Sequence, residues 1–241
     1  MAKQPSTSPS SPNRLLASLS TADFESVRPH LKAVELVHEA VLFEAGARID
    51  RVYFPYSGII SLVVGLGGGE MIEAAMIGRD SMLGGAAALD GQISLNKAII
   101  QLAGAGATLD VARFRKAAEA SPAFRTTLIR HEQVLFAQAQ QSAACNASHT
   151  VEARLARWLL RSRDLSGSDT LALTQEFLAQ MLGVRRTSVT LVANTLQDAG
   201  LIHYRRGVID ITNMDGLRAA SCECYGTVKA HYDRLLNGAP K

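Results

Sequence analysis

The spacing of apolar and polar residues divides the chain into three stretches of different period. Up to about residue 102, short apolar runs alternate with turn residues, which is typical of β-strands. From 122 to 147 the sequence favours a single uninterrupted helix. Beyond 148, apolar residues recur at helical spacing, and only 201–211 returns to a strand-like pattern. The pattern therefore predicts an α+β chain whose strand-rich N-terminal half and mostly helical C-terminal part are joined by a long helix.

The N-terminal half is predicted to form one helix followed by short strands. The helix covers about 20–31. The strands are predicted at 33–38, 41–44, 51–55, 58–64, 71–77 and 93–102. Many short strands at this spacing indicate a sandwich or a barrel. The glycines at 67–69 lie between two strand patterns and lack the Lys-Ser/Thr and following helix of a phosphate-binding loop, so we interpret them as a hairpin turn.

The segment 122–147 contains neither a glycine nor an internal proline. A helix of this length spans roughly 39 Å. Two rows of residues recur at intervals of seven: Leu128, Leu135 and Ser142, and Ile129, Phe136 and Ala143. The helix therefore has apolar surface on more than one side. One side can pack on the N-terminal half and the other on a second copy of the chain, although burial within one subunit fits the same pattern.

Residues 173–211 predict two short helices and a β-hairpin. Thr174 can cap a helix at 175–182, and Gly183 supplies the tight turn before a second helix at about 186–199. The buried stripe of the second helix is Val189, Val192, Ala193 and Leu196. Strand patterns at 201–204 and 208–211 flank a turn that contains Arg205 and Arg206. Two helices joined by a glycine turn and followed by a basic hairpin indicate a winged helix-turn-helix.

This order of elements and its residue pattern resemble the DNA-binding domain of the Crp/Fnr family of bacterial transcription regulators, over about 151–211. The resemblance implies an N-terminal double-stranded β-helix, a jelly-roll-like β-roll, followed by a long dimerisation helix and a C-terminal winged helix-turn-helix. We assign residues 1–13 to a disordered tail and 14–121 to a sensory β-roll domain similar to cyclic-nucleotide-binding domains. Residues 122–147 are assigned to the dimerisation helix and 148–241 to the DNA-binding domain.

The second helix of the motif is expected to lie in the major groove of DNA. Its outward face begins basic and stays small and polar, which suits hydrogen bonds to base edges. Arg186 stands where the family makes base contacts, and the arginines of the hairpin are expected on phosphates. Leu191 is expected either to meet a thymine methyl or to pack on the first helix. The predicted DNA-contacting residues are Thr174, Arg185, Arg186, Thr187, Ser188, Thr190, Leu191, Asn194, Arg205 and Arg206.

The charge of the chain is distributed unevenly. The net charge is +3, yet residues 1–147 hold 13 basic and 13 acidic side chains, so the whole excess lies in 148–241. Between 184 and 207 there are four arginines and a single acid, Asp198. A solvated charged surface would explain an isolated pair of arginines. Two pairs at places that a winged helix turns towards one duplex favour contact with DNA.

The effector of the predicted roll differs from the best-known ligand of the family. Relatives that bind cyclic nucleotides hold them with a Gly-Glu pair and an arginine, and the matching segments here give a candidate pocket of Gly84, Gly85, Asn96 and Lys97. The glutamate is absent and Asn96 replaces the arginine, while Lys97 points to the opposite strand face. Cyclic AMP is therefore not expected to bind. Backbone amides at Gly84 and Gly85 can form an anion nest, but glycines more often serve a strand bend.

The cysteines and histidines define the other cofactor expectations. No cysteine precedes the long helix, which argues against an iron–sulfur cluster, and His30 and His38 are isolated, which argues against haem. Cys145 and His149 are spaced i and i+4, as in half of a metal site or thiol switch. We expect Cys222 and Cys224 in one C-terminal helix, where their side chains would point about 200° apart and would not share a metal. Thiols without chemistry are the favoured interpretation.

The remaining classes of function fit the sequence less well. A β-roll metalloenzyme needs clustered histidines and carboxylates on neighbouring strands, and the six histidines are not spaced in that way. An interaction module would leave 174–211 unexplained. Without a membrane-spanning run, a signal peptide or more than three cysteines, the chain is expected in the cytoplasm. The expected partners are double-stranded DNA, a second copy of the chain, an unknown small-molecule effector at the roll and, for an activator, RNA polymerase.

Overall fold

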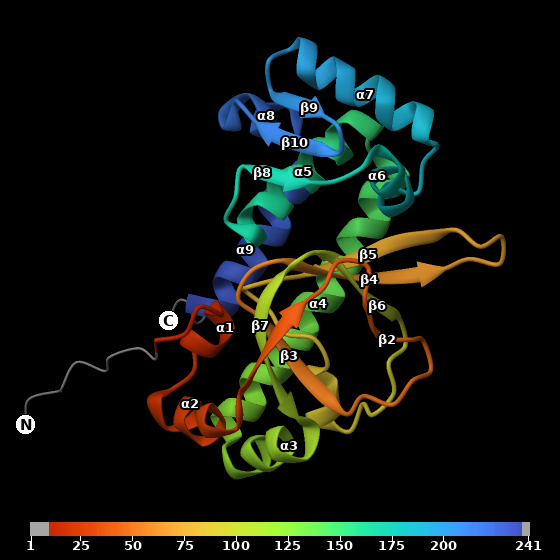
Figure 1. Cartoon of the computed structure of the whole chain (residues 1–241). Helices are drawn as coiled ribbons and strands as arrows, with labels where there is room; N and C mark the ends of the chain where they lie inside the picture. The colour runs from red at the N-terminus through yellow and green to blue at the C-terminus, as the bar shows by residue number, and fades with distance from the viewer. Residues whose placement is uncertain (1–9, 238–241) are drawn as a thin grey trace, which may run out of the picture.

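The structure is a computed structural model that describes residues 10–237, and its fold confirms the predicted α+β class (Figure 1). A strand-rich domain fills the lower half of the view, and a smaller domain with a helix-turn-helix lies above it. Most of the predicted tail, residues 1–9, lies outside the described part. Asn13, the last residue of the predicted tail, is not disordered. It is buried, and its side-chain amide donates to the backbone carbonyls of Pro55 and Ser81 at 2.9 Å.

The lower domain is a roll of two antiparallel sheets. One sheet has the order β1 (Lys32–Leu36), β7 (Gly104–Asp110), β3 (Arg51–Pro55). The other has the order β2 (Val41–Phe43), β6 (Lys97–Leu102), β4 (Ile59–Gly65), β5 (Met71–Ile77). The predicted strands are confirmed apart from residues 93–96, which precede β6. Apolar side chains of both sheets fill the interior.

Several elements of the lower domain differ from the sequence prediction. The single helix expected at 20–31 is split into α2 (Thr21–Val27) and the 3-10 helix η1 (Arg28–His30), and α1 (Arg14–Ala17) precedes them. Pro29 lacks the amide that would continue α2. Strand β7 was not predicted because its small residues have low β propensity. At Gly106 a Cβ would lie 2.7 Å from the Phe54 carbonyl oxygen. Helix α3 (Val111–Ala120), capped by Asp110, was also missed.

The long helix is α4 (Pro122–Ser148), one residue longer than predicted. It lies against β5 and against the 3-10 helix η2 (Gly85–Leu89) of the roll. Its buried residues are Phe124, Leu128, His131, Gln138, Ser142 and Cys145. Ile129 and Phe136, by contrast, are 43% and 65% exposed. One face of α4 is therefore part of the core, and an apolar strip on another face is open to solvent.

The upper domain begins with α5 (Val151–Ser166) and β8 (Thr170–Ala172), and continues through α6 (Gln175–Leu182) and α7 (Arg186–Asp198). The hairpin of β9 (Ile202–Arg205) and β10 (Val208–Ile211) follows, and β8 adds a third strand beside β10. Helix α8 (Met214–Ala220) completes the domain. Helix α9 (Cys224–Asn237) then runs back along α4 towards the roll (Figure 1). No helix in residues 10–237 is both long and apolar enough to cross a membrane.

The two domains share one apolar core. Ile59 and Met76 of the roll pack in the same buried cluster as Trp158 and Leu159 of α5. Apolar burial of this kind contributes about 25 cal/mol per Å² removed from water, so it favours one fixed arrangement of the domains. The interface between the roll and the upper domain, called the joint below, is thus continuous with the core of each domain.

Charged groups are buried in the same joint. Arg161 on α5 pairs with Asp80, which follows β5, at 2.7 Å between Nη1 and Oδ2. The guanidinium carbon of Arg161 lies 4.4 Å from the centre of the Tyr232 ring on α9. One side chain therefore binds the roll, the upper domain and the last helix together.

Glu73 on β5 is a second buried group at the joint. Its carboxylate accepts hydrogen bonds from Trp158 Nε1, at 3.0 Å, and from Ser61 Oγ. Burial raises the pKa of Glu73 to about 7, against the opposing effects of those hydrogen bonds and of the guanidinium groups of Arg157 and Arg161. The carboxyl group therefore changes its charge near neutral pH.

This raised pKa predicts that stability falls as the pH rises. In the unfolded chain the carboxyl has its ordinary pKa of 4.5, so between that value and about 7 the folded state binds the extra proton. The stabilisation is present below the unfolded pKa and is lost as pH rises through the folded pKa; the loss is on the order of 3 kcal/mol at most. We expect Glu73→Gln, which still offers Trp158 an acceptor, to remove this dependence. Urea denaturation at several pH values measures it, and equal slopes for both proteins would contradict it.

Candidate nucleic-acid interface

The helix-turn-helix has the predicted geometry. Thr174 caps α6, with its hydroxyl accepting from the Phe177 amide at 3.1 Å. Gly183 ends α6 at φ +62°, where a side chain would be strained, and a Cβ there would lie 2.9 Å from Ile72 Cδ1 on β5. The turn between the two helices is thus packed directly on the roll. This contact fixes the direction in which α7 leaves the turn.

Helix α7 has one buried and one open face. Val189, Ala193 and Leu196 are buried, as the sequence predicted. Among the predicted contact residues on this helix, those exposed to solvent are Arg186, Thr187, Leu191 and Asn194. Ser188 and Thr190 are half-buried, and the Thr190 hydroxyl donates to Gln175 Oε1 at 2.6 Å. Thr190 therefore links α7 to α6 and has less freedom to meet a ligand than its exposed neighbours.

Leu191 separates the two alternatives given by the sequence. It is 70% exposed, so packing on the first helix is wrong. A large apolar side chain on an otherwise polar open face is suited to a partner surface with an apolar group of its own, such as a thymine methyl.

The first turn of α7 offers free backbone amides. Its N-cap, Arg185, makes no capping hydrogen bond through its side chain, and only the third amide of the turn, that of Ser188, finds an acceptor there, the Arg185 carbonyl oxygen at 2.9 Å. Arg186 Nη1 lies 3.9 Å from Glu176 Oε2, and both side chains are mostly exposed, which makes the pair weak. An anion placed here would meet amides, the positive end of the helix dipole and two arginines. The missing cap is a signal that the sequence analysis did not use.

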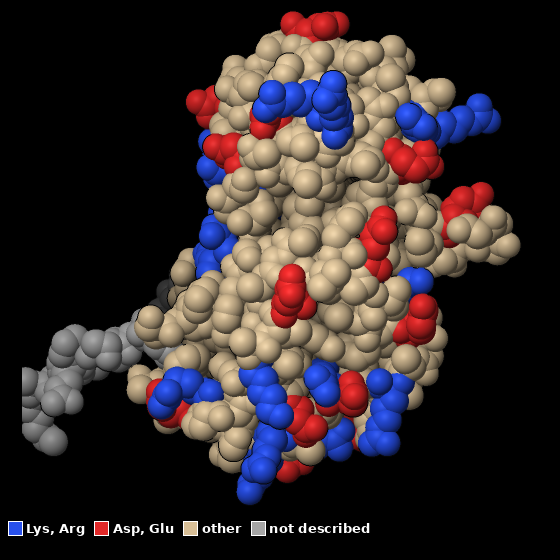
Figure 2. Space-filling model, in the orientation of Figure 1, with Lys and Arg blue, Asp and Glu red and all other residues tan. Residues whose placement is uncertain are grey.

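The hairpin places its arginines at an open tip. Arg206 has φ +45° and Gly207 φ +79°, so these residues form a tight turn between the paired residues Arg205 and Val208. Arg205 is exposed and its Nη2 lies 3.8 Å from Asp210 Oδ2, while the other oxygen of that carboxylate, Oδ1, accepts from the Thr170 hydroxyl. Figure 2 shows basic side chains over the hairpin and beside the turn that precedes α7. The tip therefore presents exposed positive charge, and its one ion pair, Arg205 with Asp210, is long.

The predicted effector residues lie in two segments with different neighbours. Gly84 has φ +88° at the start of η2, and a side chain on Gly85 would collide with Met82 and Glu132. The backbone carbonyl of Asn96 accepts a hydrogen bond from the Ser94 hydroxyl. The Lys97 ammonium pairs with Glu44 Oε1 at 3.2 Å. The charge of Lys97 is thus already paired with a carboxylate. A pocket formed by both segments stays a prediction.

The cysteines correct one sequence expectation. Cys222 lies in the turn between α8 and α9, and Cys224 is the first residue of α9, so the two do not share a helix as expected. Their side chains converge instead with those of Cys145 and His149, and the four potential ligand atoms lie within 4.8 Å of one another. Burial raises the pKa of Cys145 and, together with its hydrogen bond to Cys145, raises that of Cys222 to about 12.

The histidines of the roll have ordinary structural environments. His38 Nδ1 lies 2.8 Å from the Gln101 carbonyl oxygen, and its ring meets Phe177 at 6.3 Å between centroids. His30 is exposed at the end of η1.

Comparison with known protein families finds a match for the upper domain. Residues 153–220 match the Crp-like helix-turn-helix domain. That match covers α5 to α8 and ends before α9. No curated protein sequence is significantly similar to the chain.

Solved structures extend the likeness to the whole fold. A transcriptional regulator of the Crp/Fnr family from Eubacterium rectale aligns with a TM-score of 0.65 and 17% identity, covering 86% of this chain and 96% of that one. A CRP/FNR family regulator from Thermus thermophilus aligns with a TM-score of 0.65 and 21% identity, covering 79% and 98%. At such identities the likeness shows the fold, and the fold includes the roll and the long helix as well as the upper domain.

Leu191 and Leu196 on α7 provide a matched pair of substitutions. Leu196→Ala removes a buried side chain and should cost about 2–5 kcal/mol of stability. Leu191→Ala should change stability by about 0.5 kcal/mol or less, because the side chain is already in water. Thermal and urea unfolding of the two variants measure this difference. A large loss for Leu191→Ala would mean that the residue belongs to the core.

Proposed function

We propose that this chain, a Crp-like helix-turn-helix domain on the fold of the Crp/Fnr regulators, is a transcription regulator that binds specific promoter sequences as a homodimer. The observation that carries the proposal is the open face of α7, which begins with Arg186 and an uncapped helix start and lies beside a cationic hairpin tip. A polar helix of this kind suits the major groove, and flanking arginines suit the phosphates on either side.

The roles of the contact residues follow from their exposure and charge. Arg186 is the proposed base-reading residue, because its guanidinium can form two hydrogen bonds to guanine. Arg205 and Arg206 are proposed to bind phosphates, which fixes the position of the domain without reading sequence. Thr187, Leu191 and Asn194 complete the reading face. Thr174 and Thr190 act mainly by holding α6 and α7 in place.

The second copy is proposed to pack along the open strip of α4. Ile129 and Phe136 are seven residues apart and exposed, and Ala143 continues the row at the same spacing. The large side chains at one end of the row offer apolar surface to bury. The alanine at the other end permits the two helices to approach closely. A two-fold dimer on this face would present two α7 helices to the halves of a near-palindromic site.

Control by an effector is proposed to pass through β5. Strand β5 contacts the helix-turn-helix through Ile72 at Gly183 and contacts α5 through Glu73 at Trp158. A small molecule that moves the roll would therefore shift the reading helix without an intermediate linker. Cyclic AMP is not the proposed effector, and neither catalysis nor a haem or iron–sulfur cofactor is part of the proposal. If the regulator activates transcription, RNA polymerase is a further partner.

The decisive experiment is selection of bound duplexes from random DNA by the purified full chain, followed by affinity measurements on the selected site. We expect a near-palindromic consensus sequence. On it, Arg186→Ala should lose roughly 1–3 kcal/mol of discrimination, about 5- to 150-fold, with little change on random DNA. Equal losses on both duplexes would contradict base reading by Arg186.

The paired wing variant Arg205→Ala/Arg206→Ala is the matched control. It should weaken binding to every duplex alike and reduce the salt slope by about two counterions or fewer. Failure to recover any consensus from random DNA would contradict the proposed function itself, whatever the variants do.

The dimer face makes an independent prediction. Phe136→Glu places a charge in the exposed strip, so we expect the dimer to dissociate while each subunit stays folded, because the side chain is 65% exposed in one subunit. Light scattering coupled to size-exclusion chromatography measures the mass. Thr126→Glu, at an exposed neutral position near the start of the same helix, adds the same single charge and serves as the control. A Phe136→Glu protein that kept twice the subunit mass would exclude this face.

A further inference from the structure

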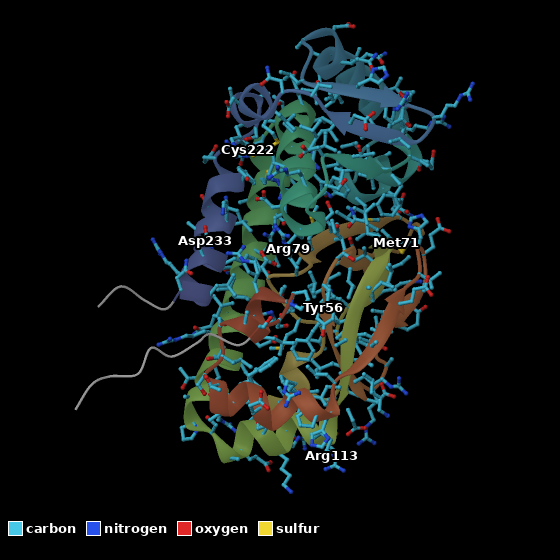
Figure 3. All side chains as sticks on the ribbon, turned by 60° about the vertical axis from the view of Figure 1, so that its left-hand side comes forward. Tyr56, Met71, Arg79, Arg113, Cys222 and Asp233 are labelled. Carbon is cyan, nitrogen blue, oxygen red and sulfur yellow. The ribbon has the colours of Figure 1, made fainter. Side chains whose placement is uncertain are left out.

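Four metal-binding side chains from two distant parts of the chain meet beside the start of α9. Cys145 is on the last turns of α4, and His149 is the residue that ends that helix. Cys222 and Cys224 flank the corner between α8 and α9. All three cysteines are buried and none forms a disulfide. Figure 3 shows Cys222 where the end of α4 meets the last helices.

The separations are those of a tetrahedral site. The sulfurs of Cys145 and Cys222 are 3.5 Å apart, and the sulfur of Cys224 lies 3.6 Å from His149 Nδ1. In a tetrahedron with metal–sulfur bonds near 2.3 Å and metal–nitrogen bonds near 2.0 Å, ligand atoms are about 3.5–3.8 Å apart. Both measured edges fall at these values, and the remaining ones are bounded by 4.8 Å. The ligand atoms therefore surround a space of the size of one ion.

The surrounding groups orient the ligands. His149 Nε2, the ring nitrogen that faces away from Cys224, lies 3.2 Å from Glu223 Oε1. A carboxylate on the second ring nitrogen is the usual partner of a metal-binding histidine, because it fixes the tautomer that leaves the other nitrogen free to coordinate. Gln141 Nε2 donates to the Cys224 sulfur at 3.0 Å. Such a hydrogen bond stabilises a thiolate.

Charged groups on α5 offset part of the cost of burying thiolate ligands, although burial is the larger effect on the Cys145 thiol. The guanidinium groups of Arg154 and Arg157, on α5, interact electrostatically with the cysteine sulfurs. Three thiolates and one divalent ion carry a single net negative charge, which these arginines can balance.

We propose that Cys145, His149, Cys222 and Cys224 form a closed Cys3His site for a zinc-class divalent cation. Binding exchanges three thiol protons, released to water, for three metal–sulfur bonds and adds one metal–nitrogen bond from a neutral imidazole. All four positions of the ion are filled by the protein, so the site is structural rather than catalytic. The metal fastens the α8–α9 corner to residues 149–150, the short link between α4 and α5.

A disulfide between Cys145 and Cys222 is the competing arrangement. It needs the sulfurs to close from 3.5 Å to about 2.05 Å and an external oxidant, and it would leave Cys224 and His149 without a role. The convergence of all four groups, together with the carboxylate on the histidine, is explained by a metal and not by a disulfide. The two arrangements also differ in mass and in thiol count.

The first test measures the metal content of the purified full chain. We expect about one zinc per chain by elemental mass spectrometry, and intact mass without loss of two hydrogens. Cys224→Ser and His149→Ala should lower the content well below one, while His30→Ala, at an exposed histidine of η1, should not. Less than about a tenth of an ion per chain, with Cys145 and Cys222 oxidised to a disulfide, would overturn the proposal. Iron in place of zinc would overturn the zinc assignment.

A second test uses a variant that leaves the core untouched. Glu223 is 74% exposed in its side chain, so Glu223→Ala should fold normally and yet bind metal about 10- to 100-fold more weakly. Cobalt titration of metal-free protein, followed by its tetrahedral visible absorption and displaced by zinc, measures the affinity. Asp215→Ala, an exposed acid of α8, is the matched control. Equal affinity of Glu223→Ala and wild type, or octahedral cobalt spectra, would overturn the site; DNA binding is not needed for either readout.

Discussion

The arrangement of the molecule depends on one buried cation. Arg161 is almost completely excluded from water, and a guanidinium in that position is tolerable only with a carboxylate beside it. Asp80 supplies that charge from the roll, and Tyr232 supplies an aromatic face from α9. Removing either the carboxylate or the arginine leaves an uncompensated charge in the joint. The relative position of roll, upper domain and last helix is therefore set by electrostatics as well as by apolar burial.

The helix-turn-helix could be predicted from sequence to within a residue, because its signals are local. A cap at Thr174, a glycine at 183 and the stripe from Val189 to Leu196 each act over a few positions. Strand β7 was missed for the opposite reason. Its glycines are selected by how closely Phe54 and its neighbours approach, and that contact is between segments far apart in sequence.

The cysteine cluster shows the same limit in the chemistry of a site. Cys145 and His149 can be recognised as a pair from their spacing, but a helix boundary between Cys222 and Cys224 decides whether the second pair can join them. A pattern of two residues does not locate that boundary. The buried acid Glu73 is similar, since only the placement of Trp158 over β5 shows that a carboxylate in a strand is a joint residue.

The shared core has a consequence for how such a domain can be inherited or transferred. A domain joined to its neighbour by a flexible linker can be exchanged between proteins as an independent unit, because its surface is complete without the neighbour. Here Trp158 and Leu159 are buried against Ile59 and Met76, so cutting the chain near residue 149 would expose a continuous apolar surface on both pieces. The two halves must therefore change together, and a substitution in the roll is constrained by the upper domain as strictly as by its own interior.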